Sequence, residues 1–194
     1  MDERLVELTP ERHGLAIDLA YAGSANLAGR PIYGNRCCLA HREVEPGLVR
    51  AAAWAALCGL RLKVLDAYRP PWAQERLWRC LPDPRYVASV EVGSCHTRGV
   101  AVDVTLIDGQ GRDLDMGTPF DAMAAEARHF HPAMPPEVQR NRAVLLAVMT
   151  QAGFQPSDTE WWHYQLPNAR AFPLLQDDRL VPRPETEPAP SGSH

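Results

Sequence analysis

The amino-acid sequence predicts a single α+β domain in which helices pack against a mainly antiparallel sheet. Three observations lead to this prediction. First, the 194-residue chain is 45% hydrophobic and 23% charged, which is an ordinary globular composition, and its length suits one domain. Second, helical and β-branched segments follow one another in mixed order. Third, Asp108-Gly109-Gln110-Gly111 is a typical turn between two antiparallel strands.

The first part of the predicted domain contains a helix, a strand and a second helix. Residues Leu48–Leu60 are rich in alanine and leucine, which predicts a buried helix. Leu62–Tyr68 is a short apolar run, and it reads as a strand because the prolines that follow start a helix better than they continue a strand. The second helix is expected at Trp72–Cys80.

The second part of the chain supplies further strands and one long helix. Residues from about Pro136 to Ala152 place apolar side chains on one stripe, which predicts a helix that Gly153 ends. Runs of β-branched and aromatic residues predict strands, and the turn after the second run leads to Arg112–Asp115. These strands are expected at Val87–Val92, Val100–Ile107 and Glu160–Leu166.

The C-terminal residues have a different composition. From about Gln176 onward the chain is polar and rich in proline, so we expect a domain at 1–175 and a flexible tail at 176–194. The first residues carry acids where a secretory signal needs a basic start and an apolar run. No run approaches the roughly 18 apolar residues of a membrane span. A cytoplasmic protein without membrane contact is therefore expected.

Charge and cysteine content exclude other classes of function. The net charge of −4 offers no general attraction to a phosphate backbone, which disfavours a nucleic-acid partner. The five cysteines include no C-x-x-C pair, so neither a disulfide framework nor a thiolate zinc ribbon is expected. A chain of this length folds without a metal, so a bound metal would serve chemistry.

Two segments carry residues suited to bind a metal ion. In the first, His96 precedes a glycine turn and Asp103 lies in the strand that follows. A carboxylate inside such an apolar run is costly to bury without a partner, although a hydrogen-bonded aspartate is the alternative. In the second segment, Glu160 precedes two tryptophans and His163. The tryptophans could be core residues or could wall a metal site.

Together these segments offer a three-ligand site for one zinc ion. Histidine and aspartate are common zinc ligands, and three protein ligands leave a fourth position for water, as in catalytic zinc sites. His96, Asp103 and His163 would be the ligands. Zinc lowers the pKa of its bound water to about 7, and Glu160 is placed to act as the base.

Two further features have competing interpretations. Arg69 at the end of a predicted strand could stabilise an oxyanion, or it could form a surface ion pair. His129 and His131 are two apart and could share a face of a strand, but no acidic partner follows them in a matching pattern. We therefore do not expect a metal site there.

Taken together, these motifs resemble the zinc D-alanyl-D-alanine dipeptidases of the VanX type, within the zinc DD-peptidase superfamily. The resemblance extends from about Tyr21 to Leu166. The ordered set of motifs carries it: Tyr21-Ala22, Asn26-Leu27-Ala28-Gly29, Asp66-Ala67-Tyr68-Arg69-Pro70, Ser94-x-His96-x-x-Gly99-x-Ala101-x-Asp103, Asp115-Met116-Gly117-Thr118-Pro119-Phe120-Asp121, Asn141-Arg142 and Glu160-Trp161-Trp162-His163.

The resemblance implies the hedgehog/DD-peptidase-like fold and the hydrolysis of D-Ala-D-Ala. It also implies that His96, Asp103 and His163 bind zinc, that Glu160 is the general base and that Arg69 stabilises the tetrahedral intermediate. The remaining matches are substrate contacts, with Asp121 at the substrate ammonium group and Ser94 and Tyr21 near its peptide and carboxylate.

Two alternative functions remain open at this point. One is a DD-carboxypeptidase or endopeptidase that trims longer cell-wall peptides, which the acidic N-terminus disfavours because such substrates lie outside the membrane. The other is a non-catalytic module that binds peptide and zinc. Glu160 and Arg69 disfavour it, because a binding module needs no base beside the metal.

Overall fold

The computed structural model describes residues 2–84, 87–89 and 92–182. Its centre is a five-stranded sheet with the strand order β2-β4-β5-β7-β6. Three of the four strand pairs are antiparallel and only β2 and β4 are parallel, which confirms the predicted α+β class. The strands span Ala16–Ile17 (β2), Arg61–Asp66 (β4), Ala101–Ile107 (β5), Gln155–Pro156 (β6) and His163–Gln165 (β7).

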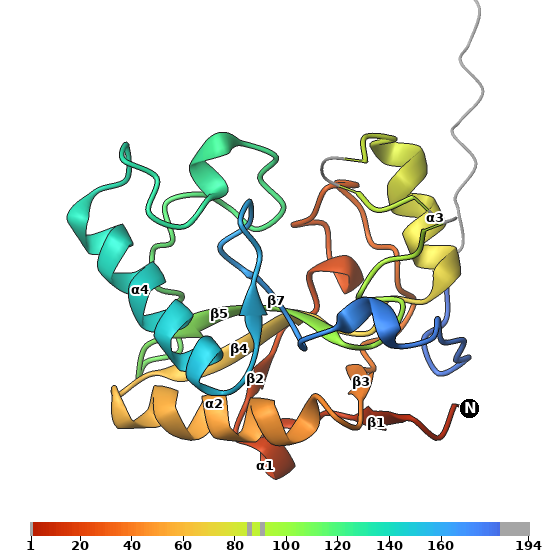
Figure 1. Cartoon of the computed structure of the whole chain (residues 1–194), viewed down its shortest axis with the longest axis horizontal. Coiled ribbons are helices and arrows are strands. Elements are labelled where there is room, and N and C mark those ends of the chain that lie inside the picture. The colour runs from red at the N-terminus through yellow and green to blue at the C-terminus, as the bar shows by residue number, and fades with distance from the viewer. Residues whose placement is uncertain (1, 85–86, 90–91, 183–194) are drawn as a thin grey trace, which may run out of the picture.

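One face of this sheet holds the main core. Helices α2 (Glu45–Leu57) and α4 (Pro136–Gln151) contact each other and the sheet on that side (Figure 1). Both were expected from sequence, and the predicted stripe is buried: Val138, Leu145 and Met149 lie in α4, and Ala152 follows its last residue. The alternating valines and leucines of β4 and β5 pack under these helices. The opposite face of the sheet, called the open face below, carries candidate functional residues.

The remaining elements lie around this sheet. Helix α3 follows β4 directly, as predicted, because consecutive prolines set its first turn. A separate two-stranded sheet pairs β1 with β3. These elements span Leu5–Glu7 (β1), Pro10–His13 (α1), Leu39–His41 (β3) and Pro71–Cys80 (α3). All five cysteines are free, as expected. None of the described helices combines the length and the apolar composition that a membrane crossing needs.

A bulge in β4 changes which face its last residue occupies. Val64 pairs with Val104 in the core, whereas Asp66 pairs with Asp103. Two residue steps along β4 therefore match a single step along β5. Regular alternation would place Asp66 on the same face as Val64. The extra residue, Leu65, re-aims Asp66 away from the core. The bulge therefore puts two carboxylates side by side on the open face.

Two predicted segments differ in the structure. Of Val87–Val92, the described residues are not in a strand, and residues 90 and 91 lie outside the described chain. The carbonyl of Ala88 accepts a hydrogen bond from the Gln74 side chain instead of a strand partner. The last predicted strand is shorter than expected, because the backbone N–H of Trp161 donates to Ala127 in a loop.

The packed domain also continues beyond residue 175. Residues 176–182 have the composition of a tail, but Leu180 is buried and Pro182 forms a β-bridge with Tyr33. The Val181 carbonyl accepts from the N–H of Gly34, so this segment is bonded to the domain. The boundary expected at 175 is thus too early for these contacts. Residues 183–194 of the predicted tail lie outside the described residues.

Candidate metal centre and substrate cavity

The neighbouring strands β4, β5 and β7 place side chains of the candidate site close together. The register pairs Asp66 of β4 with Asp103 of β5, and Asp103 with His163 of β7. His96 arrives from the loop before β5, where Gly99 turns the chain with a φ of 69°. The N–H of Gly99 donates to the carbonyl of His96 and closes this turn. The predicted turn between His96 and Asp103 is confirmed.

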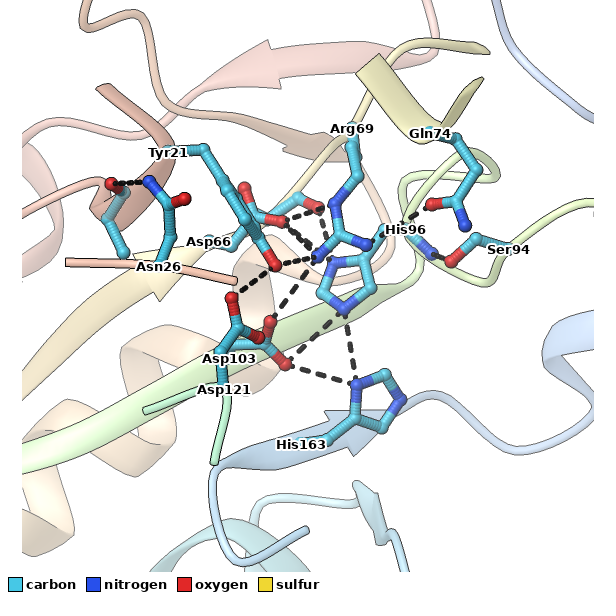
Figure 2. Close-up of polar contacts among 12 residues, drawn as sticks. Tyr21, Asn26, Asp66, Arg69, Gln74, Ser94, His96, Asp103, Asp121 and His163 are labelled. Carbon is cyan, nitrogen blue, oxygen red and sulfur yellow. Dashed lines mark hydrogen bonds and ion pairs between the residues drawn. The ribbon is translucent and has the colours of Figure 1, made fainter. Parts of the chain in front are cut away.

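Three donor atoms meet at the centre of this arrangement (Figure 2). Nε2 of His96 lies 3.2 Å from Nδ1 of His163 and 3.3 Å from Oδ1 of Asp103, and those two atoms are 3.1 Å apart. Two ligands of a tetrahedral zinc ion, each about 2.0–2.2 Å from the metal, lie about 3.3–3.6 Å apart. The observed separations of 3.1–3.3 Å lie at or just below this range, so the three atoms are close enough to bind one metal ion together.

Hydrogen bonds orient both imidazole rings for this role. Nδ1 of His96 is 2.7 Å from the carbonyl oxygen of Ala67, which can only accept, so Nδ1 is the donor and Nε2 is the nitrogen that faces His163 and Asp103. In His163, Nε2 faces Oε1 of Gln165 at 3.4 Å, and Nδ1 faces Nε2 of His96 and Oδ1 of Asp103. Such outer contacts fix the tautomer and the direction of a metal-binding histidine.

Arg69 is buried beside the three donor atoms described above, so it is not a surface residue. Its guanidinium donates to Asp66 at 2.8–3.0 Å and to Oε1 of Gln74 at 3.2 Å, and Nη2 is 3.4 Å from the hydroxyl of Tyr21 (Figure 2). Nη2 is also 3.7 Å from Oδ2 of Asp103. Burial opposes its charge, but the surrounding groups raise the pKa of Arg69 well above its ordinary value. The structure excludes the surface ion pair that was the alternative.

Asp121 lines the same cavity in a constrained conformation. Its φ of 60° is in the left-handed region, which is uncommon for a residue with a side chain. Its Oδ2 accepts hydrogen bonds from the Tyr21 hydroxyl at 2.8 Å and from the N–H of Leu27 at 3.0 Å. Burial raises the pKa of Asp121 to about 6. A half-buried carboxylate held in this way is suited to bind a cationic group.

Glu160 and Ser94 complete the lining. Burial raises the pKa of Glu160, which brings this carboxyl closer to the range of a general base. The Ser94 hydroxyl accepts a hydrogen bond from the N–H of His96 at 3.1 Å, so Ser94 also stabilises the loop that carries His96.

All eight predicted site residues line one cavity of about 180 Å³. They are Tyr21, Arg69, Ser94, His96, Asp103, Asp121, Glu160 and His163.

Three residues that support this site have no role predicted from the sequence. Asp66 and Gln74 hold Arg69, and Gln165 orients His163. Asp66 was visible within the motif that contains Arg69, but its direction depends on the bulge. No sequence signal marks Gln74 or Gln165. His129 and His131 are not part of the candidate metal-binding group found among the described residues.

Comparison with known proteins gives a consistent match. The family model described as D-ala-D-ala dipeptidase (Peptidase M15) matches residues 1–182. The D-alanyl-D-alanine dipeptidase of Escherichia coli strain K12 is 46% identical over 173 residues, which cover 89% of this chain and 90% of that protein. The D-alanyl-D-alanine dipeptidase of Enterococcus faecalis is 30% identical over 188 residues, covering 86% and 93%. That of Enterococcus faecium is 31% identical over 179 residues, covering 79% and 87%.

Proposed function

The chain belongs to the D-Ala-D-Ala dipeptidase family of metallopeptidases, and we propose that it is a zinc enzyme that hydrolyses D-alanyl-D-alanine to two molecules of D-alanine. One observation carries the proposal. Three metal-binding atoms within 3.3 Å of one another share a small cavity with a buried arginine and two carboxylates of raised pKa. These are the parts that hydrolysis of a small charged peptide requires.

We assign the proton transfers to Glu160. When bound by His96, Asp103 and His163, zinc would act as a Lewis acid that polarises the peptide carbonyl of the substrate and lowers the pKa of a water molecule. The Glu160 carboxylate takes a proton from the attacking water and later gives it to the nitrogen of the leaving D-alanine. Its raised pKa supports both steps, because a base that is too acidic would hold the proton too weakly.

Arg69 and Asp121 have complementary charge roles in the proposal. Arg69 is fixed by Asp66 and Gln74, so its positive charge is preorganised for the negative charge that develops on the peptide oxygen. Asp121 binds the ammonium group of the substrate. Tyr21 lies between them and contacts both. The Tyr21 hydroxyl therefore links the group proposed to bind the ammonium to the group proposed to stabilise the peptide oxygen.

The size of the cavity favours a short substrate. Pockets for drug-sized ligands are about 300–1,000 Å³, whereas this cavity is about 180 Å³. A free dipeptide presents an ammonium group for Asp121, while a longer wall peptide places another residue at that point. Both features support a dipeptidase over an enzyme that trims longer peptides.

The deciding experiment measures D-alanine released from D-Ala-D-Ala and from a pentapeptide that ends in D-Ala-D-Ala. We expect the zinc-loaded chain to hydrolyse the dipeptide with far higher kcat/KM, and a chelator to abolish that activity until zinc is restored. Faster release from the pentapeptide would contradict the proposal in favour of a carboxypeptidase. Dipeptide binding without release, with zinc bound, would indicate a binding module.

The raised pKa of Asp121 predicts a specific pH dependence of KM. Because Asp121 titrates at about 6, it is charged above that pH and neutral below it. The KM for D-Ala-D-Ala should therefore rise as the pH falls through 6, towards about tenfold per pH unit. Propanoyl-D-alanine, which lacks the ammonium group, is the control ligand. Its competitive inhibition constant should not show this rise, and a parallel rise in both constants would argue against the role of Asp121.

A further inference from the structure

Arg142 is a fully buried arginine that the proposed chemistry does not use. It lies on α4, and its side chain points away from solvent with 0% relative exposure. Within the described chain no carboxylate forms an ion pair with it. A buried charge is costly unless hydrogen bonds compensate for it, so its contacts indicate its role.

The guanidinium of Arg142 binds backbone carbonyls from both ends of one loop. Nε donates to the carbonyl of Met116 at 2.8 Å, and Nη1 donates to those of Glu126 at 2.9 Å and Arg128 at 2.6 Å. The neighbouring side chain of Asn141 donates to the carbonyl of Asp115 at 2.9 Å. Residues 116–128 are thus closed into a loop by one cation.

This loop carries Asp121 and has little regular structure of its own. Its only helix or strand is the single 3-10 turn Ala125–Ala127. Asp121 has a positive φ of 60°, which a residue with a side chain seldom adopts unless its surroundings hold it. The loop also contacts the segment that contains Glu160, because the indole N–H of Trp161 donates a hydrogen bond to the Thr118 hydroxyl at 2.9 Å.

We infer that Arg142 is a positioning residue that holds the Asp121 carboxylate where it binds the substrate ammonium group. The inference rests on the proposed function. Lysine at this position would keep the charge but lose the planar arrangement of donors that reaches three carbonyls together. The loop would then loosen, and Asp121 would shift relative to Tyr21 and Leu27. A displacement of about 1 Å in a binding group can cost up to about 10²-fold in activity.

The test compares Arg142→Lys with Arg140→Lys, an exposed arginine on the same helix. In Arg142→Lys, the KM for D-Ala-D-Ala should rise about tenfold or more, with a much smaller change in kcat. The inhibition constant of propanoyl-D-alanine should stay within about twofold, because that ligand does not use Asp121. Arg140→Lys should match the wild-type chain in all three constants.

A general loss of structure would give a different pattern. It would weaken both ligands together or lower kcat alone, and either result would overturn the inference. If Arg142→Lys does not fold, Asn141→Ala removes the bond from the same helix to Asp115, the residue just before the loop, and should raise KM about two- to threefold with the propanoyl-D-alanine constant unchanged. An unchanged KM in Asn141→Ala would then overturn it. Absence of turnover in the wild-type chain would overturn the proposed function itself, and this inference with it.

Discussion

Replacing Glu160 with glutamine is expected to lower kcat for D-Ala-D-Ala by a factor of about 10²–10⁴. Glutamine has nearly the same shape but cannot accept a proton from water or return one to the leaving amine. Glu160 is not one of the three residues whose donor atoms cluster, so the metal content of the variant should equal that of the wild-type chain. Initial rates and metal analysis on the same preparation measure both quantities.

Asp158→Asn provides the matched control for Glu160. Asp158 is an exposed carboxylate two positions earlier in the same loop, so this variant makes the same chemical change outside the cavity. Its kcat should stay close to that of the wild-type chain. Wild-type kcat in Glu160→Gln, with metal bound, would show that another group is the base.

Replacing His96 with alanine is expected to remove the metal and with it all measurable turnover. Two ligands would remain, Asp103 and His163, whereas catalytic zinc sites use three protein ligands. The loss should therefore exceed that in Glu160→Gln, which keeps the metal. Metal content after dialysis and turnover of D-Ala-D-Ala measure the effect.

His131→Ala is the control for this variant, because it tests the other histidine pair in the sequence. Its metal content and activity should be those of the wild-type chain, since His129 and His131 do not lie in the donor cluster. Retention of one ion per chain in His96→Ala would contradict the assigned site. Loss of the ion in His131→Ala would do so as well.

The long elements can be predicted from the sequence because their patterns are local. The helices α2, α3 and α4 and the strands β4 and β5 follow from apolar periodicity and from the position of proline. The short strands β1, β2, β3 and β6 have two or three residues each, too few to show a period. Their pairing depends on segments far apart in the chain, as between Leu5 and His41.

The same distinction explains what was missed in the site. His96, Asp103 and His163 were predicted because each lies in a motif of unusual composition. The direction of Asp66 depends on a bulge that no residue type announces. The contacts of Gln74 with Ala88, and of Arg142 with Met116, join segments that only the folded chain brings together. Packing of residues 176–182 likewise depends on partners such as Asn35.

The most direct test of the account is the position of zinc in a crystal of the zinc-loaded chain, measured by anomalous diffraction at the zinc absorption edge. We expect one peak per chain, about 2.0–2.2 Å from Nε2 of His96, Nδ1 of His163 and Oδ1 of Asp103. A peak at other residues, or no peak with zinc in excess, would contradict the assignment of this cavity as the metal centre of a dipeptidase.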